Sequence, residues 1–256
     1  MKYGIRDTML KAPLETTFSV AAEIGFDGVE FCIGSAYREN ILWQDSGAAQ
    51  LKGLAAAAGI EISSLSPGVF SQVHPALPEA EKRAEGVDIL RHMIESCAAV
   101  DTRHILVPMF PKDMDQWPEA TWEQLVDGFK TLGAIAQQHG VILDLETTFS
   151  AEQLAMLLQR VDSPAVKVYH DTGNTMMRGQ DPAAEILLLG SDGVGMIHAK
   201  DTDRQHLGEG RVDFAAVQAA MHQISYDGYI VLETPVGEDA NADNGKNLAF
   251  IQNLGG

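Results

Sequence analysis

Four strand-like runs in the second half of the sequence each end on a side chain that can bind a metal ion: VILDLE at 141–146, VKVYHD at 166–171, VGMIH at 194–198 and YIVLE at 229–233. The terminal residues Glu146, Asp171, His198 and Glu233 are separated by 25, 27 and 35 positions. Each interval accommodates one strand, one helix and two loops, which is about one βα unit. We therefore expect the four side chains to meet at the carboxyl ends of parallel strands.

The rest of the chain shows the same alternation of strand-like and helix-like segments. Apolar residues recur with helical period between the strands, and glycine follows three expected helices just before the next strand, at positions 25, 59 and 140. Strands are expected at 3–6, 28–33, 60–65, 104–109, 141–146, 166–171, 194–198 and 229–233.

Eight βα units can form a closed barrel or an open sheet. In an open sheet, where strands lie about 4.8 Å apart, the outermost of four neighbours would be ~14 Å apart. A ring brings the same four strand ends toward one axis. The sequence therefore predicts the α/β class with a single (β/α)8 TIM barrel, formed as one domain by residues 1–256, close to the ~250 residues typical of that fold.

Composition and charge narrow the range of partners. The net charge of −18 opposes binding to nucleic acid phosphates, and the sequence has neither a signal peptide nor a run of 18 apolar residues, so no membrane association is expected. Cys32 and Cys97 are expected to be reduced thiols in a cytoplasmic protein. Disorder is expected only near 236–245.

Three carboxylates and one imidazole at one point indicate a cation. Without one, the carboxylates would repel each other, and a buried unpaired charge costs several kcal/mol. The oxygen-rich ligand set favours one Mn²⁺ ion and leaves Mg²⁺, Co²⁺ and Zn²⁺ as alternatives. The absence of a cysteine ligand argues against a structural zinc site.

The sequence around these positions resembles the xylose isomerase-like TIM barrels of the sugar phosphate isomerase/epimerase superfamily. The resemblance is carried by LET at 145–147, DTGN at 171–174, HAKD at 198–201, GEGRVD at 208–213 and LETP at 232–235. It implies that Glu146, Asp171, His198 and Glu233 bind one divalent metal ion. It also implies that Glu146 and Glu233 flank the substrate as acid and base.

Five further residues are candidates for substrate binding. Arg204 and Glu152 each follow a metal ligand by six positions, which matches substrate contacts in the epimerases that the chain resembles. Asn174 stands where those epimerases tend to carry histidine. Lys200 has the same inward parity as the histidine ligand, and His74 follows the third strand on a loop. A solvent-facing Arg204 or Lys200, a helix-capping Glu152 and a buried loop His74 are the structural alternatives.

Arg6 and His170 are two further residues at or next to strand ends. Arg6 closes the first strand and is a candidate partner for a phosphate or carboxylate group. His170 is expected to face the helices, because neighbouring residues of a strand point to opposite sides.

The sequence thus predicts a divalent-metal-dependent isomerase or epimerase of a small sugar or keto-polyol, with or without a phosphate group. The reaction implied is proton abstraction next to a metal-bound carbonyl through an enediolate. A dehydratase of an inosose or dehydroshikimate-like substrate and a non-catalytic sugar-binding barrel are the alternatives. The resemblance also implies a homodimer or a homotetramer. An apurinic endonuclease is disfavoured by the acidic charge and by the lack of ligands on strands three and four.

Overall fold

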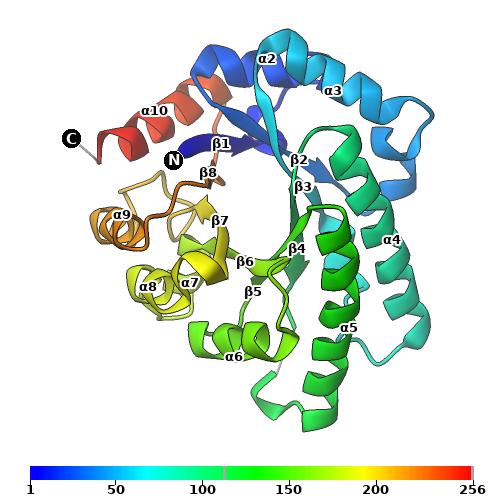
Figure 1. The fold of residues 1–256 in the computed structure, drawn as a ribbon. Helices are drawn as coiled ribbons and strands as arrows, with labels where there is room; N and C mark the ends of the chain where they lie inside the picture. Colours follow the sequence, from blue (N-terminus) through cyan, green and yellow to red (C-terminus); the bar gives the residue numbers. More distant parts are fainter. Residues whose placement is uncertain (112–113, 255–256) are drawn as a thin grey trace.

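The computed structural model describes residues 1–111 and 114–254, and within them eight parallel strands form a closed barrel in sequence order (Figure 1). This arrangement confirms the predicted (β/α)8 fold class. The strands are β1 (Lys2–Arg6), β2 (Gly28–Ile33), β3 (Glu61–Pro67), β4 (His104–Met109), β5 (Ile142–Thr147), β6 (Val166–Asp171), β7 (Val194–Ala199) and β8 (Tyr229–Leu232).

Helices surround the barrel and connect its strands (Figure 1). The helices are α1 (Asp7–Leu10), α2 (Leu14–Ile24), α3 (Gly47–Ala58), α4 (Ala80–Ala99), α5 (Glu119–Gln138), α6 (Ala151–Val161), α7 (Thr172–Met177), α8 (Pro182–Gly193), α9 (Phe214–Gln223) and α10 (Ala240–Asn253). No helix within the described residues is both long enough and apolar enough to cross a membrane.

The predicted strands overlap all eight observed strands, and their ends differ by two residues at most. The glycine signals explain part of this agreement. Gly25 caps α2 with φ of 109°, and its N–H donates to the carbonyl groups of Ala21 and Ala22. Gly59 caps α3 with φ of 68°. Both lie in the left-handed region, which glycine adopts at little steric cost.

The expectation of disorder near 236–245 is wrong, because α10 begins at Ala240. The Asp239 carboxylate accepts a hydrogen bond from the N–H of Ala242 and caps the helix. Just before it, the N–H of Gly237 donates to Asp243 at 2.6 Å, and Lys11 donates to the carbonyl of Gly237 at 2.6 Å. Polar contacts therefore order a segment whose composition is typical of a loop.

Two buried clusters stabilise the fold. The larger one fills the space between the strands and the surrounding helices. The smaller one consists of one inward-pointing residue from each of four strands: Leu106, Tyr169, Met196 and Val231. The residues two positions further along β6, β7 and β8 keep the same inward direction. The strand period therefore sends Asp171, His198 and Glu233 to the mouth of the barrel.

Replacing Leu106 by alanine is expected to destabilise the barrel. The side chain is 1% exposed, and buried Leu→Ala substitutions cost about 2–5 kcal/mol because they remove apolar contacts and leave a cavity. Leu187 on α8 is 40% exposed and provides the matched control, with an expected change within about 0.5 kcal/mol. Urea unfolding measures both, and equal losses would contradict the proposed packing.

Candidate metal centre and active site

The structure brings the four strand-end residues together at the mouth of the barrel. One ligand atom from each of Glu146, Asp171, His198 and Glu233 lies within 4.8 Å of the others, and three of these side chains are buried while Glu233 is partly exposed. Asp171 and His198 are direct neighbours in the β6–β7 register. We call these four residues the ligand cluster, and their convergence is what the strand spacing predicts.

The chemistry of the ligand cluster fits a divalent cation. His198 Nδ1 lies 3.3 Å from Glu233 Oε2, 3.5 Å from Glu146 Oε1 and 3.9 Å from Asp171 Oδ2. Among the described residues, no hydrogen bond is made by the buried atoms Asp171 Oδ2, His198 Nδ1 or Glu233 Oε2. Burial, and then the charge of Glu146, raise the pKa of Asp171. A bound cation would compensate both effects and use the unpaired atoms.

A buried carboxylate on β2, Glu30, contacts the far side of the histidine ligand. Its two carboxylate oxygens each lie 3.3 Å from His198 Nε2. Burial alone would lower the pKa of His198, but the charges and hydrogen bonds of Glu30, together with Glu146 and Glu233, raise it to about 10. Glu30 is not among the residues predicted from the sequence, because it lies within a strand and not at a strand end. The sequence feature that distinguishes Glu30 is that it is the single charged residue in the apolar run GVEFCI at 28–33.

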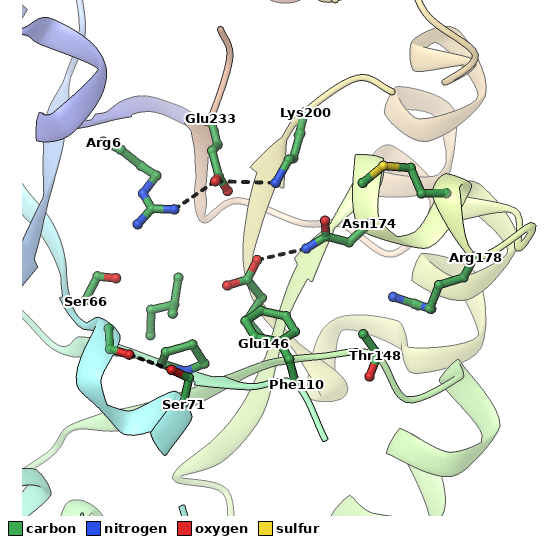
Figure 2. A pocket seen from close by; sticks show the side chains of 14 residues that line it. Arg6, Ser66, Ser71, Phe110, Glu146, Thr148, Asn174, Arg178, Lys200 and Glu233 are labelled. Atoms are coloured by element: carbon green, nitrogen blue, oxygen red, sulfur yellow. Dashed lines mark hydrogen bonds and ion pairs between the residues drawn. The ribbon is translucent and has the colours of Figure 1, made fainter. Parts of the chain in front are cut away.

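The two glutamates of the ligand cluster have different surroundings (Figure 2). Arg6 Nη1 lies 2.9 Å and Lys200 Nζ 3.4 Å from Oε1 of Glu233. Glu146 Oε1 instead accepts a hydrogen bond of 3.2 Å from the amide of Asn174. One carboxylate is thus flanked by two cations and the other by a neutral donor.

A cavity of about 560 Å³ opens above the ligand cluster. Glu146, Glu233, Asn174 and Lys200 line it, together with Arg6, Ser66, Phe110, Thr148 and Arg178 (Figure 2). Thr148 and Arg178 are not among the residues predicted from the sequence, because they lie in a βα loop and at the end of α7, where no strand period marks an inward side chain. The cavity combines hydroxyl, amide and cationic groups around two carboxylates.

A second cavity of about 550 Å³ adjoins the first and shares Met177, Lys200 and Glu233 with it. Arg204 lines this second cavity from the loop between β7 and α9, and its side chain is exposed. Of the five predicted substrate contacts, Asn174 and Lys200 line the first cavity, and Arg204 lines the second.

The other two predicted substrate contacts lie elsewhere. Glu152 is exposed in the first turn of α6 and lines a separate small cavity with Gln180 and Leu188. His74 is buried, with 5% of its surface exposed, and is absent from the lining of both cavities as far as the described residues show. The structure does not bring either residue to the ligand cluster, because their loops place them outside the barrel mouth.

His170 faces away from the cavity, as its strand parity predicts. Its Nε2 lies 3.2 Å from Glu185 Oε2 of α8, and Thr175 donates to the same oxygen at 3.0 Å. These buried contacts tie α8 to β6 and α7. They support the segment that carries Asp171 and Asn174.

The fold and the site define a barrel with a candidate metal centre, and the sequence matches the family of xylose isomerase-like TIM barrels over residues 18–254. The chain belongs to this family. An L-ribulose 3-epimerase of Methylomonas sp. (strain DH-1) is 24% identical over 249 residues, which cover 91% of this chain and 82% of that protein.

Two further similarities extend the comparison. An inosose dehydratase of Geobacillus kaustophilus (strain HTA426) is 26% identical over 149 residues, which are 48% of this chain and 48% of that protein. A solved structure of L-ribulose 3-epimerase superposes with a TM-score of 0.86 at 20% identity, covering 99% of this chain and 94% of that chain. The structural similarity shows a shared fold.

His74 is expected to make stability depend on pH. Burial lowers its pKa to about 4, from about 6.5 in an unfolded chain. Below pH 6.5 the unfolded chain therefore binds a proton that the folded chain does not, and stability falls until His74 itself protonates near pH 4. Between pH 7 and 4.5, this residue alone is expected to remove about 2–3 kcal/mol from the free energy of unfolding.

Urea unfolding of the wild type and of His74→Gln at pH 7, 5.5 and 4.5 measures this contribution. The variant is expected to lose less stability on acidification than the wild type, since other titrating groups are common to both proteins. Parallel pH curves for the two proteins would show that burial does not hold His74 neutral.

Proposed function

We propose that this protein is a divalent-metal-dependent isomerase or epimerase of a small sugar or keto-polyol. The observation that carries the proposal is the ligand cluster beside a cavity lined by charged, amide and hydroxyl groups, with Glu146 coming from β5 and Glu233 from the position just after β8. The similarity to L-ribulose 3-epimerase over most of both chains supports it. The proposed metal is one Mn²⁺ ion, with Mg²⁺, Co²⁺ and Zn²⁺ as alternatives.

Glu146, Asp171, His198 and Glu233 would hold the metal ion, which supplies a positive charge that stabilises negative charge developing on a substrate oxygen. Glu146 and Glu233 are the proposed acid and base. Both line the cavity; Glu146 lies in β5 and Glu233 directly follows β8. One would remove a proton from the carbon next to the carbonyl group, and the other would return a proton from the other side.

The surroundings of the two glutamates suggest how a substrate is held. Lys200 lines both cavities and lies 3.6 Å from Asp171 Oδ2 as well as near Glu233, so its ammonium group can donate to a substrate oxygen above the ligand cluster. Asn174 can do the same beside Glu146, and Arg204 at the second cavity. The hydroxyl groups of Ser66 and Thr148 add neutral partners, which suits a polyhydroxy substrate with or without a phosphate group.

A dehydratase is the second candidate, and the similarity to an inosose dehydratase favours it. Such a reaction also begins with proton removal beside a carbonyl group, but it expels a hydroxyl group from the next carbon. Product analysis with a panel of ketoses and inososes separates the two activities. Epimerised or isomerised products support the first candidate, and an unsaturated product supports the second. A homodimer or homotetramer in the cytoplasm belongs to the same proposal.

Removal of the metal is expected to abolish activity without unfolding the barrel, because none of the four residues of the ligand cluster belongs to the two buried apolar clusters. Elemental analysis of the purified protein is expected to find about one divalent ion per chain. EDTA treatment should end turnover and keep the circular dichroism spectrum, and Mn²⁺ should restore turnover. Activity on ketoses or inososes that survives complete metal removal would contradict the proposal.

Glu146→Gln and Glu233→Gln are expected to slow proton exchange between substrate and solvent by about 10²–10⁴-fold, because each removes an acid–base group. Glu23→Gln, on the exposed side of α2, is the matched control and is expected to leave exchange unchanged. Incorporation of solvent deuterium into an active ketose measures the effect by NMR. Full exchange in both variants would exclude this pair as the acid and base.

A further inference from the structure

Glu30 is a fully buried carboxylate in the barrel interior, and four polar side chains surround it. Its Oε2 accepts hydrogen bonds from Tyr169 at 2.8 Å and from Ser64 at 3.0 Å. Arg6 Nε lies 3.1 Å from its Oε1, and His198 Nε2 lies 3.3 Å from both oxygens. An ionised carboxylate at 0% exposure is strongly unfavourable unless it is paired and hydrogen-bonded. This pairing therefore keeps a charged group directly below the ligand cluster.

The His198 ring lies between Glu30 and the other three residues of the ligand cluster. Its Nε2 faces Glu30, whereas its Nδ1 faces Glu146, Asp171 and Glu233. An imidazole that binds a metal through Nδ1 carries its proton on Nε2, and a carboxylate that accepts this proton fixes both the tautomer and the ring orientation. The ring centroid of Tyr169 lies 4.3 Å from that of His198, so packing also restricts rotation of the imidazole.

Arg6 extends the influence of Glu30 to a second ligand. The guanidinium contacts Glu30 through Nε and Glu233 Oε1 through Nη1, at 3.1 and 2.9 Å. Arg6 forms its ion pair with Oε1 of Glu233. The other oxygen, Oε2, therefore faces His198 Nδ1 at 3.3 Å. A planar guanidinium presents several donors in a fixed geometry, so the positions of the two carboxylates are linked.

We infer that Glu30 is a positioning residue of the metal centre: it holds His198 with Nε2 protonated and Nδ1 directed at the metal, and through Arg6 it orients Glu233. Among the described residues, Glu30 lines neither cavity, so its role is exerted through these ligands. The inference rests on the proposed metal-dependent function and extends it to a residue of β2 outside the ligand cluster. A buried residue of the barrel interior thereby fixes the orientation of two residues of the proposed metal centre.

The affinity for Mn²⁺ alone tests this role without a substrate. Glu30→Gln keeps the size of the side chain but replaces one acceptor oxygen by a donor group, which conflicts with either His198 Nε2–H or Arg6. Isothermal titration is expected to show a 10–100-fold weaker affinity, as is typical when an outer partner of a metal ligand is removed. Tyr169→Phe removes only a neutral donor to Glu30 and keeps the carboxylate, and it is expected to weaken binding less than about threefold.

Spectra of ¹⁵N-histidine in the Zn²⁺-loaded protein provide the second measurement. The wild type is expected to show His198 protonated at Nε2 and metal-bound at Nδ1, and Glu30→Gln is expected to lose this signature. Glu30→Asp retains the charge but withdraws it by one methylene group, so it is also expected to weaken Mn²⁺ binding. It replaces Glu30→Gln in the comparison if that variant does not fold.

The outcomes separate the inference from the proposed function. A wild-type protein that binds no Mn²⁺ would overturn the proposed metal centre itself. Equal affinity and an unchanged histidine signature in Glu30→Gln would overturn the role of Glu30 alone. Equal losses in Glu30→Gln and Tyr169→Phe, or failure of both Glu30 variants to fold, would assign Glu30 to general packing and would also overturn the inference.

Discussion

Three carboxylates and one imidazole are confined within 4.8 Å of one another at the barrel mouth, and this confinement determines which groups can surround them. Charges of the same sign at this distance, largely removed from water, repel each other strongly unless a cation or paired groups compensate them. The surrounding residues provide part of that compensation: Arg6 and Lys200 lie against Glu233, and Lys200 also lies near Asp171. A divalent ion bound by the four ligands would provide the rest.

The closed barrel makes this confinement geometrically available. Parallel strands end at the same face, and the side-chain period of two places every second residue inside the ring. Along β6 this period takes the chain from Tyr169, which packs in the interior, to Asp171 at the mouth, and along β7 from Met196 to His198. The interior is polar on one side, where Glu30 accepts hydrogen bonds from Tyr169 and Ser64. The candidate metal centre thus lies on a buried polar network as well as on apolar packing.

The fold class and the ligand cluster were predictable from the sequence because both follow from regular periods. Strand runs, glycine caps and the spacing of four strand ends require no knowledge of how loops fold. Glu30 was missed since its charge lies inside a strand, where its partners come from β1, β3, β6 and β7 and are far away in sequence. Its pairing emerges only when the ring closes.

Loops explain the other differences. Glu152 was predicted because its spacing after Glu146 matches a substrate contact of the epimerases, and His74 because it follows the third strand on a loop; among the described residues, neither lines the two cavities at the ligand cluster. Arg178 and Thr148 reach the cavity from segments without a period. The order of the segment at 236–239 likewise depends on contacts of Lys11 and Asp243 with its backbone, which join distant parts of the chain. Local composition does not encode these contacts.

The position of bound Mn²⁺ shows whether the ligand cluster is a metal centre. In a crystal soaked with Mn²⁺, X-ray data collected near the manganese absorption edge reveal the ion by its anomalous scattering. One strong peak per chain is expected. It should lie in contact with one carboxylate oxygen from each of Glu146, Asp171 and Glu233 and with Nδ1 of His198. A peak at another position, or no peak between these four side chains at saturating Mn²⁺, would contradict this expectation.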